Sequence, residues 1–255
     1  MVSQSTFLKP PKSLLRSVGR AIADYKMISP DDRILIAVSG GKDSLTLLNI
    51  LLHIRRHAPI KFDLAAITVD PQMEGFDPSP LKAYMASMGI TYYYQSQPIT
   101  HRAVNTTGTH TYCSFYSRMK RNIMYATARR EKYNVLALAQ HLDDFAECFL
   151  LSAFQGGQLR SMQAKYFNDA GNLRVIRPLI YTREHQTTAF ANAANLPIIA
   201  DNCEAALELP TPKQHVKTLL ATEEQHNKQL FQNLLTTLRP LLSQSYSVRN
   251  SDIKA

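Results

Sequence analysis

The residues best suited to chemistry form one short run, which follows an apolar segment and precedes a segment with helical periodicity: Ser39-Gly40-Gly41-Lys42-Asp43-Ser44. The two glycines let the backbone turn tightly and bring its N–H groups close to an anion. The start of the next helix adds partial positive charge, and Lys42 can neutralise a phosphate. The run lacks the GxxxxGK[ST] pattern, so ordinary γ-phosphoryl transfer is not expected. The alternative is a plain strand-to-helix turn capped by Asp43 or Ser44. All six residues together favour a phosphate-binding loop.

A second polar run, Gln140-His141-Leu142-Asp143-Asp144, closes another apolar segment. Adjacent carboxylates beside a phosphate site suit Mg²⁺, which prefers oxygen ligands. Glu147 falls on the same helical face and could reach back. The alternative is helix capping by Asp143, with Glu147 favourable in the first turn. Beside a phosphate loop, we interpret Asp143 and Asp144 as magnesium ligands.

The elements that must position these residues alternate in type. Strands are predicted at 34–38, 62–69, 90–94, 135–139 and 174–179, and helices at 14–25, 43–57, 80–88, 117–132, 145–154, 183–195 and 213–242. Buried apolar strands that alternate with helices indicate a parallel sheet covered on both faces. Ligands of such sheets bind beyond the carboxyl ends of the strands. Asp70, at the end of the second strand, is therefore either a binding residue or part of a turn with Pro71.

Length and composition set the class of protein. The chain has 255 residues, 45% of them hydrophobic, and 29 Lys and Arg against 20 Asp and Glu, a net charge of +9. These values suit a globular protein and exclude disordered, collagen-like and coiled-coil chains. No apolar run is long enough to span a membrane, so no membrane partner is expected. The polar N-terminus lacks a signal-peptide core, which predicts a cytoplasmic location.

Much of the positive charge lies in one segment, together with aromatic residues. The cations are Arg118, Lys120, Arg121, Arg129, Arg130 and Lys132, and the aromatic residues are Tyr112, Phe115, Tyr116 and Tyr125. Cations can hold a nucleic-acid backbone while aromatic rings stack on an extruded base. A helix with a buried aromatic face and a solvated basic face explains the segment equally well, so both interpretations stay open.

The sequence Ser-Gly-Gly-Lys-Asp-Ser resembles the signature of the PP-loop ATP pyrophosphatases. Other segments resemble the tRNA 2-thiocytidine synthetase branch of that superfamily: 25–28, 58–64, 141–144, 156–157, 176–179 and 196–199. The resemblance implies a Rossmann-like parallel sheet of about five strands, as in adenine nucleotide alpha hydrolase-like proteins, with helices on both faces and at both termini. It also implies an N-terminal helical extension (1–30), a PP-loop ATP-binding domain (31–200) and a C-terminal helical segment (201–255).

The resemblance implies an ATP- and Mg²⁺-dependent tRNA-modifying enzyme. It would adenylate a base, with cytidine in the anticodon loop expected, and then replace the activated oxygen by sulfur. ATP is expected at residues 39–44, Asp70, His141 and Arg177, and Mg²⁺ at Asp143 and Asp144. Asp43 is a further catalytic candidate. Lys165, with Arg160, would neutralise the α-phosphate or contact tRNA phosphates. His141 could equally be a satisfied interior histidine, and Arg177 a structural ion-pair partner.

The cysteines depart from the family pattern. Enzymes of this branch hold a [4Fe–4S] cluster with three thiolates, but Tyr116 stands where a CxxC pair beginning at Cys113 would end. The third ligand would come from the region of Cys203, where Asp201 is an alternative match. A phenolate is a poor substitute for a thiolate, so the cluster is doubtful. Cys148 is expected to be a small buried hydrophobe.

Three explanations compete for the altered cysteines. Cys113 and Cys203 could act without a cluster, one as a persulfide and the other as the resolving thiol. In the second explanation the ATP chemistry is kept, but the nucleophile is not sulfur. In the third, both cysteines are inert, and the protein binds nucleotide and RNA without thiolation. A PP-loop ligase with a small-molecule acceptor is a further alternative. Thiolation would need a sulfur donor, either sulfide or a cysteine-desulfurase-type protein. Members of the family are often dimeric, so the resemblance also implies a homodimer as a possible assembly.

Overall fold

The computed structural model describes residues 8–73, 75–99, 109–199 and 211–243, without the side chains of residues 109–114. The described chain forms a six-stranded sheet in the order β3-β2-β1-β4-β6-β5. The strands are β1 (Arg33–Ala37), β2 (Asp63–Asp70), β3 (Thr91–Ser96), β4 (Val135–Ala137), β5 (Lys165–Phe167) and β6 (Arg174–Ile176). All neighbours are parallel except β5 and β6. The predicted α/β class with a mostly parallel sheet is confirmed, and the short antiparallel edge strand β5 was not predicted.

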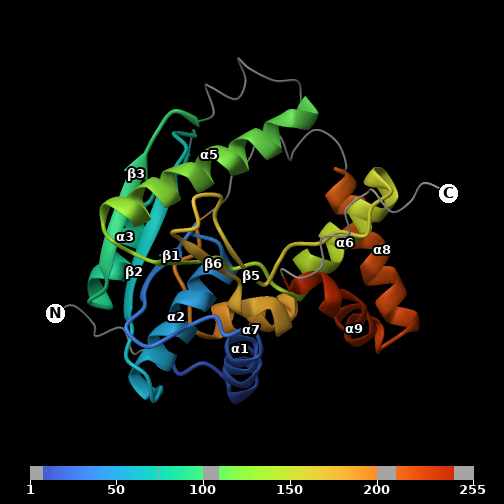
Figure 1. The fold of residues 1–255 in the computed structure, drawn as a ribbon, viewed down its shortest axis with the longest axis horizontal. Helices are drawn as coiled ribbons and strands as arrows, with labels where there is room; N and C mark the ends of the chain where they lie inside the picture. Colours follow the sequence, from blue (N-terminus) through green and yellow to red (C-terminus); the bar gives the residue numbers. More distant parts are fainter. Residues whose placement is uncertain (1–7, 74, 100–108, 200–210, 244–255) are drawn as a thin grey trace.

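The sheet separates two apolar cores, because successive residues of a strand point to opposite faces. Ile34 and Ile36 of β1 face the larger core, whereas Leu35 faces the smaller one. The larger core is covered by α1 (Lys12–Asp24), α2 (Lys42–His57), α3 (Ser79–Ser87) and α7 (Glu184–Ala193), and the other face by α5 (Thr109–Arg130). Figure 1 shows α5 on one side of the sheet and α1, α2 and α7 on the other.

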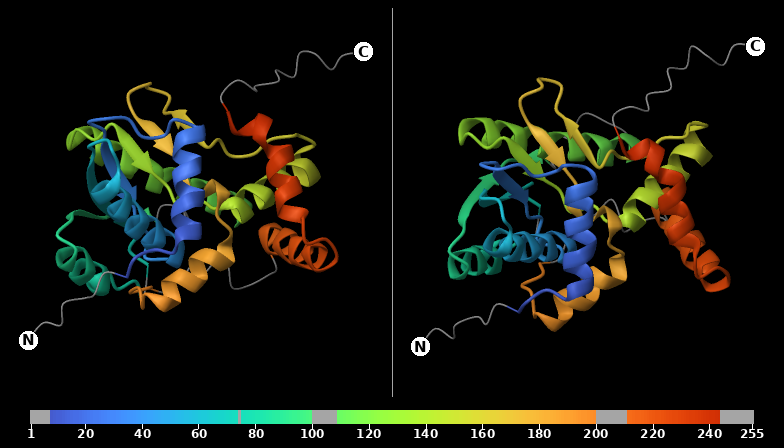
Figure 2. Two further views of the ribbon diagram at one scale, coloured as in Figure 1. Left: turned by 90° about the horizontal axis from the view of Figure 1, so that it is seen from below. Right: turned by 60° about the horizontal axis from the view of Figure 1, so that its bottom comes forward.

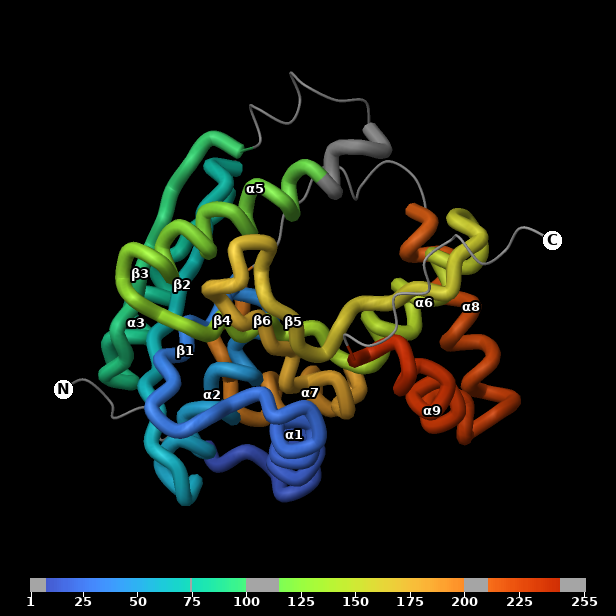
Figure 3. The backbone as a smooth tube through the Cα atoms, in the orientation of Figure 1, coloured from blue at the N-terminus to red at the C-terminus, as the bar shows by residue number. Residues whose placement is uncertain are grey.

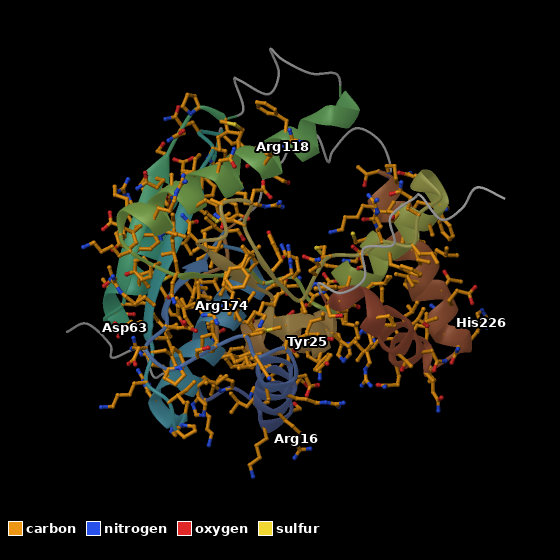
Figure 4. All side chains as sticks on the ribbon, viewed as in Figure 1. Arg16, Tyr25, Asp63, Arg118, Arg174 and His226 are labelled. Atoms are coloured by element: carbon orange, nitrogen blue, oxygen red, sulfur yellow. The ribbon has the colours of Figure 1, made fainter. Side chains whose placement is uncertain are left out.

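Three helices form a group beyond the β5 end of the sheet. They are α6 (Leu142–Gly156), α8 (Pro212–His226) and α9 (Leu230–Leu242), and both α8 and α9 pack on α6. Figure 2 shows α8 and α9 together at this end in both views, and Figure 3 traces the chain from the sheet into the group. Asp63, at the start of β2, and His226, at the end of α8, lie at opposite ends of the long axis (Figure 4). Leu238 and Leu242 of α9 join the same core as Leu14 of α1.

Most predicted elements differ from the structure by a few residues at their ends, and three differences change the organisation of the chain. The helix predicted at 117–132 begins earlier, at Thr109. The strand predicted at 174–179 ends at Ile176, because Pro178 starts a 3₁₀ helix, η1 (Pro178–Tyr181). The helix predicted at 213–242 is two helices with a break at Asn227, whose extended backbone ends α8. Among the described residues, no helix is both long and apolar enough to cross a membrane. The division at residues 30 and 200 stays a prediction.

Candidate active site

The phosphate loop connects β1 to α2 at the carboxyl edge of the sheet. In the sheet, β1 lies between β2 and β4. The chain leaves β1 toward β2 on one side, and β4 continues the sheet on the other side, so the strand order reverses at β1. Such a point in a parallel sheet is where ligands bind. The Ser39 hydroxyl accepts the Gly41 N–H at 3.3 Å, and the Ser44 hydroxyl donates to the Gly41 carbonyl at 2.9 Å. The loop is therefore preformed, with hydroxyls at both ends.

Gly40 is the residue of this loop that tolerates no side chain. Its φ is +95°, in the left-handed region, and an added Cβ would lie 2.2 Å from Cγ1 of Ile199. The Ile199 N–H also donates to the Gly40 carbonyl at 3.1 Å. The loop therefore packs against Ile199, in the segment that follows α7.

A cavity of about 420 Å³ opens at this edge of the sheet. The phosphate loop contributes Ser39, Gly41, Asp43 and Ser44 to its lining, β2 contributes Ile67 and Val69, α5 contributes Lys120 and Met124, and the segment after β4 contributes Leu138, Ala139, Gln140 and Asp144. One side is therefore polar and rich in phosphate-binding groups, whereas the β2 side is apolar. This combination suits a nucleotide, whose base is apolar on its faces and whose phosphates are anionic.

Lys42 is held by two carboxylates. Its Nζ donates to Oδ2 of Asp43 and to Oε1 of Glu184, both at 3.0 Å. Burial alone would lower the pKa of Lys42, but the two acidic partners raise it above its ordinary value. Lys42 is therefore a fully charged cation at the start of α2.

Glu184, at the start of α7, was not predicted as a site residue. Its Oε2 pairs with Nζ of Lys217 on α8 at 2.7 Å, while Oε1 accepts from Lys42. Burial would raise the pKa of Glu184, but the hydrogen bonds and charges of Lys217 and Lys42 lower it to about 2. The sequence offers no local signal for this role, because Lys42 and Glu184 are 142 positions apart.

His141 caps α6 instead of lining the cavity. Its Nδ1 accepts the Asp144 N–H at 3.4 Å, and Oδ2 of Asp144 accepts the His141 N–H at 3.1 Å, which forms a reciprocal capping box. Nε2 on the other side of the ring lies 3.7 Å from Oδ2 of Asp43. Oδ1 of Asp43 in turn accepts from the Thr187 hydroxyl. His141 is 4% exposed, as expected of a satisfied interior histidine, and its predicted contact with ATP stays a prediction.

The two candidate magnesium ligands have different surroundings. Oδ1 of Asp143 accepts from Nε of Arg183 at 3.1 Å, and Oδ2 accepts from the Glu184 N–H at 2.8 Å. Asp143 is therefore occupied in fastening α6 to α7. Asp144 lines the cavity, and its Oδ1 accepts from Lys213 at 3.0 Å. The described residues contain no cluster of three or more His, Cys, Asp or Glu arranged to hold a metal ion.

Gly40 and Lys42 of the loop do not belong to the lining of the cavity, and the predicted site residues Asp70, Arg177 and Lys165 also lie outside it. Asp70 accepts from the Tyr94 and Ser96 hydroxyls and from the Gln72 N–H. The roles of Asp70, Arg177 and Lys165 in binding or catalysis stay predictions, as do those of the loop residues 39–44, among them Asp43, which does line the cavity.

Arg177 and Lys165 are engaged elsewhere. Arg177 is 4% exposed and donates to Oε1 of Gln140 at 3.0 Å and to the Gln163 carbonyl at 2.6 Å. Because Gln140 lines the cavity, Arg177 supports the wall from behind. Lys165 donates to the Lys26 carbonyl at 3.1 Å, and its pKa is lowered by burial and by the charge of Arg174.

The cysteines are only partly described. Cys203 lies outside the described residues, and Cys113 falls on α5 where the backbone alone is described. The Tyr116 hydroxyl donates to Sδ of Met73 at 3.4 Å, and Nζ of Lys120 lies 4.5 Å from the Tyr116 ring centre. Cys148 is a half-buried thiol on α6 whose pKa is raised by burial. The Tyr116 position thus offers a phenol already engaged with Met73, which does not fit a cluster ligand.

Two cavity residues from α5 were not predicted as site residues. Lys120 and Met124 lie one helical turn apart and both line the cavity above the phosphate loop. Lys120 belongs to the basic segment, so its charge was visible in the sequence. Its direction toward the cavity depends on how α5 crosses the sheet, which the sequence does not reveal.

Comparisons with known proteins agree with this geometry. A family model described as the PP-loop domain matches residues 12–213. The tRNA-cytidine(32) 2-sulfurtransferase of Geobacter sulfurreducens is 37% identical over 229 residues, which cover 89% of each chain. This chain belongs to that sulfurtransferase family. The family member from Aliivibrio salmonicida is 39% identical over 222 residues, covering 86% of this chain and 71% of its own. The predicted membership of the PP-loop superfamily and of its 2-thiocytidine branch is confirmed.

A solved structure has the same fold as this member of the sulfurtransferase family. It is the U34-tRNA thiolase NcsA of Methanococcus maripaludis, determined with its [4Fe–4S] cluster. The TM-score is 0.74 at 20% identity, over 94% of this chain and 80% of that chain. At this identity the likeness concerns the fold alone.

Proposed function

We propose that this protein is an ATP-dependent tRNA sulfurtransferase that activates the C2 oxygen of a cytidine and replaces it with sulfur. Its relatives carry the name tRNA-cytidine(32) 2-sulfurtransferase, so cytidine 32 is the proposed target. A tRNA substrate also implies action in the cytoplasm. The observation that carries the proposal is a cavity lined on one side by the phosphate loop and on another by Lys120 and Met124 of the basic helix α5.

ATP binding follows from the preformed loop. Backbone N–H groups of residues 39–44 and the start of α2 would bind the pyrophosphate part of ATP. The charge of Lys42 stabilises the pyrophosphate as it leaves, and the apolar side chains of Ile67 and Val69 would contact adenine. Adenylation makes AMP the leaving group, which solves the difficulty that a carbonyl oxygen of a base leaves poorly.

Asp144 is the better supported of the two candidate magnesium ligands. It lines the cavity, whereas both oxygens of Asp143 are used to hold α7. Mg²⁺ is commonly held by one or two carboxylates together with substrate phosphates, and the residues here fit that mode. When bound, the ion would neutralise charge on the phosphates. Asp144 must exchange the ammonium of Lys213, 3.0 Å away, for the ion.

The sulfur is proposed to arrive without a cluster. The chain has three cysteines, and Cys148 is half-buried on α6, with a pKa that burial raises. Tyr116 bonds to Met73 and offers no thiolate. Cys113 and Cys203 are therefore proposed as a pair that receives sulfur from a separate donor, sulfide or a cysteine-desulfurase-type protein.

A desulfurase persulfide would pass its outer sulfur to one thiol, whereas sulfide would open a Cys113–Cys203 disulfide into a persulfide and a thiol. The outer persulfide sulfur would then attack C2 of the base, and AMP would leave. The second thiol would attack the cysteine sulfur of the remaining S–S bond, which releases the thiolated base and forms a Cys113–Cys203 disulfide. Sulfide would reopen that disulfide in the next cycle, whereas the desulfurase route needs a cellular dithiol to reduce it.

The deciding experiment is mass spectrometry of tRNA nucleosides from cells with and without this gene. Selective loss of 2-thiocytidine, restored by the wild-type chain and not by Lys42→Ala, is the expected result. Loss of a different modified nucleoside would mean that adenylation is retained with another target or nucleophile. An unchanged nucleoside profile would refute the proposal.

The incomplete cysteine set favours one second candidate, a PP-loop adenylating enzyme with a non-sulfur nucleophile. Assay of the purified chain with ATP and tRNA, with and without sulfide, separates the two. AMP release that depends on tRNA but not on sulfide would favour the second candidate. An RNA-binding protein without activity would release no AMP, and Lys42→Ala would leave its RNA affinity unchanged.

A further inference from the structure

The carboxylate of Glu184 is shared between two lysines from distant parts of the chain. Oε1 accepts from Lys42 at 3.0 Å, and Oε2 pairs with Lys217 of α8 at 2.7 Å. The side chains of Lys42 and Glu184 are each 25% exposed, so water screens their ion pair only in part. Glu184 thus joins the start of α2 to a helix of the C-terminal group.

We propose that Glu184 is a positioning residue for Lys42, and that Lys217 sets how strongly Glu184 holds it. The proposal rests on the proposed function, in which Lys42 contacts the pyrophosphate part of ATP. It assigns α8 a part in nucleotide binding, although neither Glu184 nor Lys217 lines the cavity.

Competition for Lys42 is the physical basis. An incoming phosphate and the Glu184 carboxylate both attract the Lys42 ammonium, so the strength of the Lys42–Glu184 pair opposes phosphate binding. Lys217 draws on the same carboxylate and reduces its effective negative charge toward Lys42. A docked α8 therefore makes Lys42 more available, and an α8 that has moved away leaves Lys42 held more tightly.

The position of Lys217 is fixed by contacts that do not involve Lys42. Arg183 binds both oxygens of Glu224, at 2.7 and 2.9 Å, which fastens α8 to the start of α7. Lys213 pairs with Asp144 at 3.0 Å and with Glu147 at 3.3 Å, which fastens the other end of α8 to α6. Because Lys217 lies between these two attachments, docking of α8 delivers its ammonium to Glu184.

The test measures the dissociation constants of inorganic pyrophosphate and of ATP by calorimetry, at fixed pH, salt and Mg²⁺. Glu184→Gln removes the competing charge, so binding should tighten by roughly threefold to tenfold. Lys217→Met leaves Glu184 fully available to Lys42, so binding should weaken by a similar factor. The double variant should behave like Glu184→Gln alone, because Lys217 acts only through Glu184.

Turnover gives a second readout. Glu184→Gln should lower kcat for tRNA-dependent pyrophosphate release while it tightens ATP binding, because Lys42 is then less well oriented. A merely structural role would weaken binding and lower turnover together in both single variants. Glu223→Gln is the matched control: it removes an exposed carboxylate of α8, keeps the Arg183–Glu224 pair and should leave both dissociation constants unchanged.

Three outcomes would overturn the inference. In the first, both single variants weaken binding. In the second, the Lys217→Met effect persists in the double variant, which would mean that Lys217 acts on the phosphate directly. If Glu184→Gln fails to fold, unchanged binding in Lys217→Met, whose side chain is 46% exposed, would overturn it alone. A wild-type chain that binds neither ATP nor pyrophosphate would instead refute the proposed function, and this inference with it.

Discussion

Gly40 and Gly41 are neighbours in the phosphate loop with different requirements. Gly40 has a φ of +95° and faces Ile199, whereas an added Cβ at Gly41 would meet only the Ser39 hydroxyl, at 3.5 Å. The backbone of Gly41 has φ −75°, which any residue adopts. Position 40 therefore requires glycine for its backbone conformation. Position 41 requires glycine only so that a ligand can come close to the backbone.

We predict that Gly40→Ala destabilises the protein by about 1 to 3 kcal/mol and abolishes ATP binding, because the loop must change its backbone and move off Ile199. Gly41→Ala should unfold at nearly the wild-type denaturant concentration and should weaken only ATP binding. Urea unfolding and calorimetric ATP titration measure the two effects. Equal loss of stability in both variants would contradict this explanation.

Asp143 and Asp144 are adjacent, but we predict that their substitution has different effects, on stability for Asp143 and on the Mg²⁺ requirement for Asp144. Asp143→Asn removes the charge that binds Arg183 and should lower stability by on the order of 1 to 3 kcal/mol, with Mg²⁺ dependence retained. Asp144→Asn should raise the Mg²⁺ concentration needed for half-maximal AMP release by tenfold or more, roughly the loss of one charged ligand. Titrating Mg²⁺ in both variants checks the assignment. A raised Mg²⁺ requirement in Asp143→Asn alone would reverse it.

The depressed pKa of Glu184 predicts a pH dependence of stability. Because the folded-state pKa is about 2, below the ordinary value of 4.5, the ionised carboxylate stabilises the fold above pH 4.5. The shift corresponds to about 3 kcal/mol without screening, and because the side chain is 25% exposed, solvent screening reduces the contribution to about 2 kcal/mol. This contribution is lost as the pH falls from 4.5 toward 2. Wild type should exceed Glu184→Gln in unfolding free energy at pH 7, and the difference should shrink by pH 3. A constant difference across that range would show that the two lysines do not lower this pKa.

At the scale of elements, Arg183 links α7 to the C-terminal helices α8 and α9. Its guanidinium contacts Asp143 of α6 and Glu224 of α8, and it lies 3.2 Å from the ring centre of Phe231 in α9. One side chain at the cap of α7 therefore touches three other helices. The acidic partners raise its pKa further, although burial opposes them.

Arg183→Met should remove this attachment and leave the largely buried carboxylate of Asp143 without its ion-pair partner, with a loss on the order of 3 kcal/mol. Hydrogen exchange should rise across α8 and α9 more than across α2. The matched control is Arg20→Met, on α1, whose 61% exposed side chain pairs with Asp24 and should contribute under about 0.5 kcal/mol. Unchanged exchange in α8 would contradict the attachment.

Local sequence predicted the elements that local forces determine. The buried strands read as apolar runs, and the phosphate loop is contiguous, so both were found. The strand β5 has three residues, none of them fully buried, and it exists only because it pairs with β6. The contact between Lys42 and Glu184 joins positions 142 residues apart, and no local pattern encodes it. The direction in which α5 crosses the sheet is likewise determined by packing, and it is this direction that brings Lys120 to the cavity.

At the scale of the whole molecule, the net charge of +9 is expected to act through α5. Arg118 and Arg121 are exposed on this helix, beside the cavity-lining Lys120. Figure 4 shows Arg118 on α5 and Arg16 on α1 at opposite sides of the molecule. A tRNA that presents its base to the cavity would therefore contact Arg118 and not Arg16.

We predict that Arg118→Gln with Arg121→Gln weakens tRNA binding and lowers the log–log salt slope by about 2, because each arginine neutralises one phosphate. Lys12→Gln with Arg16→Gln removes the same charge from exposed positions of α1 and should change neither quantity. Filter binding between low and physiological salt gives both slopes. Equal effects of the two pairs would mean that net charge alone attracts tRNA.

The shared core of α1 and α9 has a consequence for synthesis on the ribosome. Leu14, near one end of the described chain, and Leu242, near the other, are buried in the same cluster. On the α5 face of the sheet, the last residue in the sequence that belongs to the core is Val175. The α5 side can therefore be completed while the nascent chain still lacks its last helices. The opposite side keeps apolar surface exposed until α9 has emerged. Chains that terminate before α9 should be captured by chaperones or aggregate.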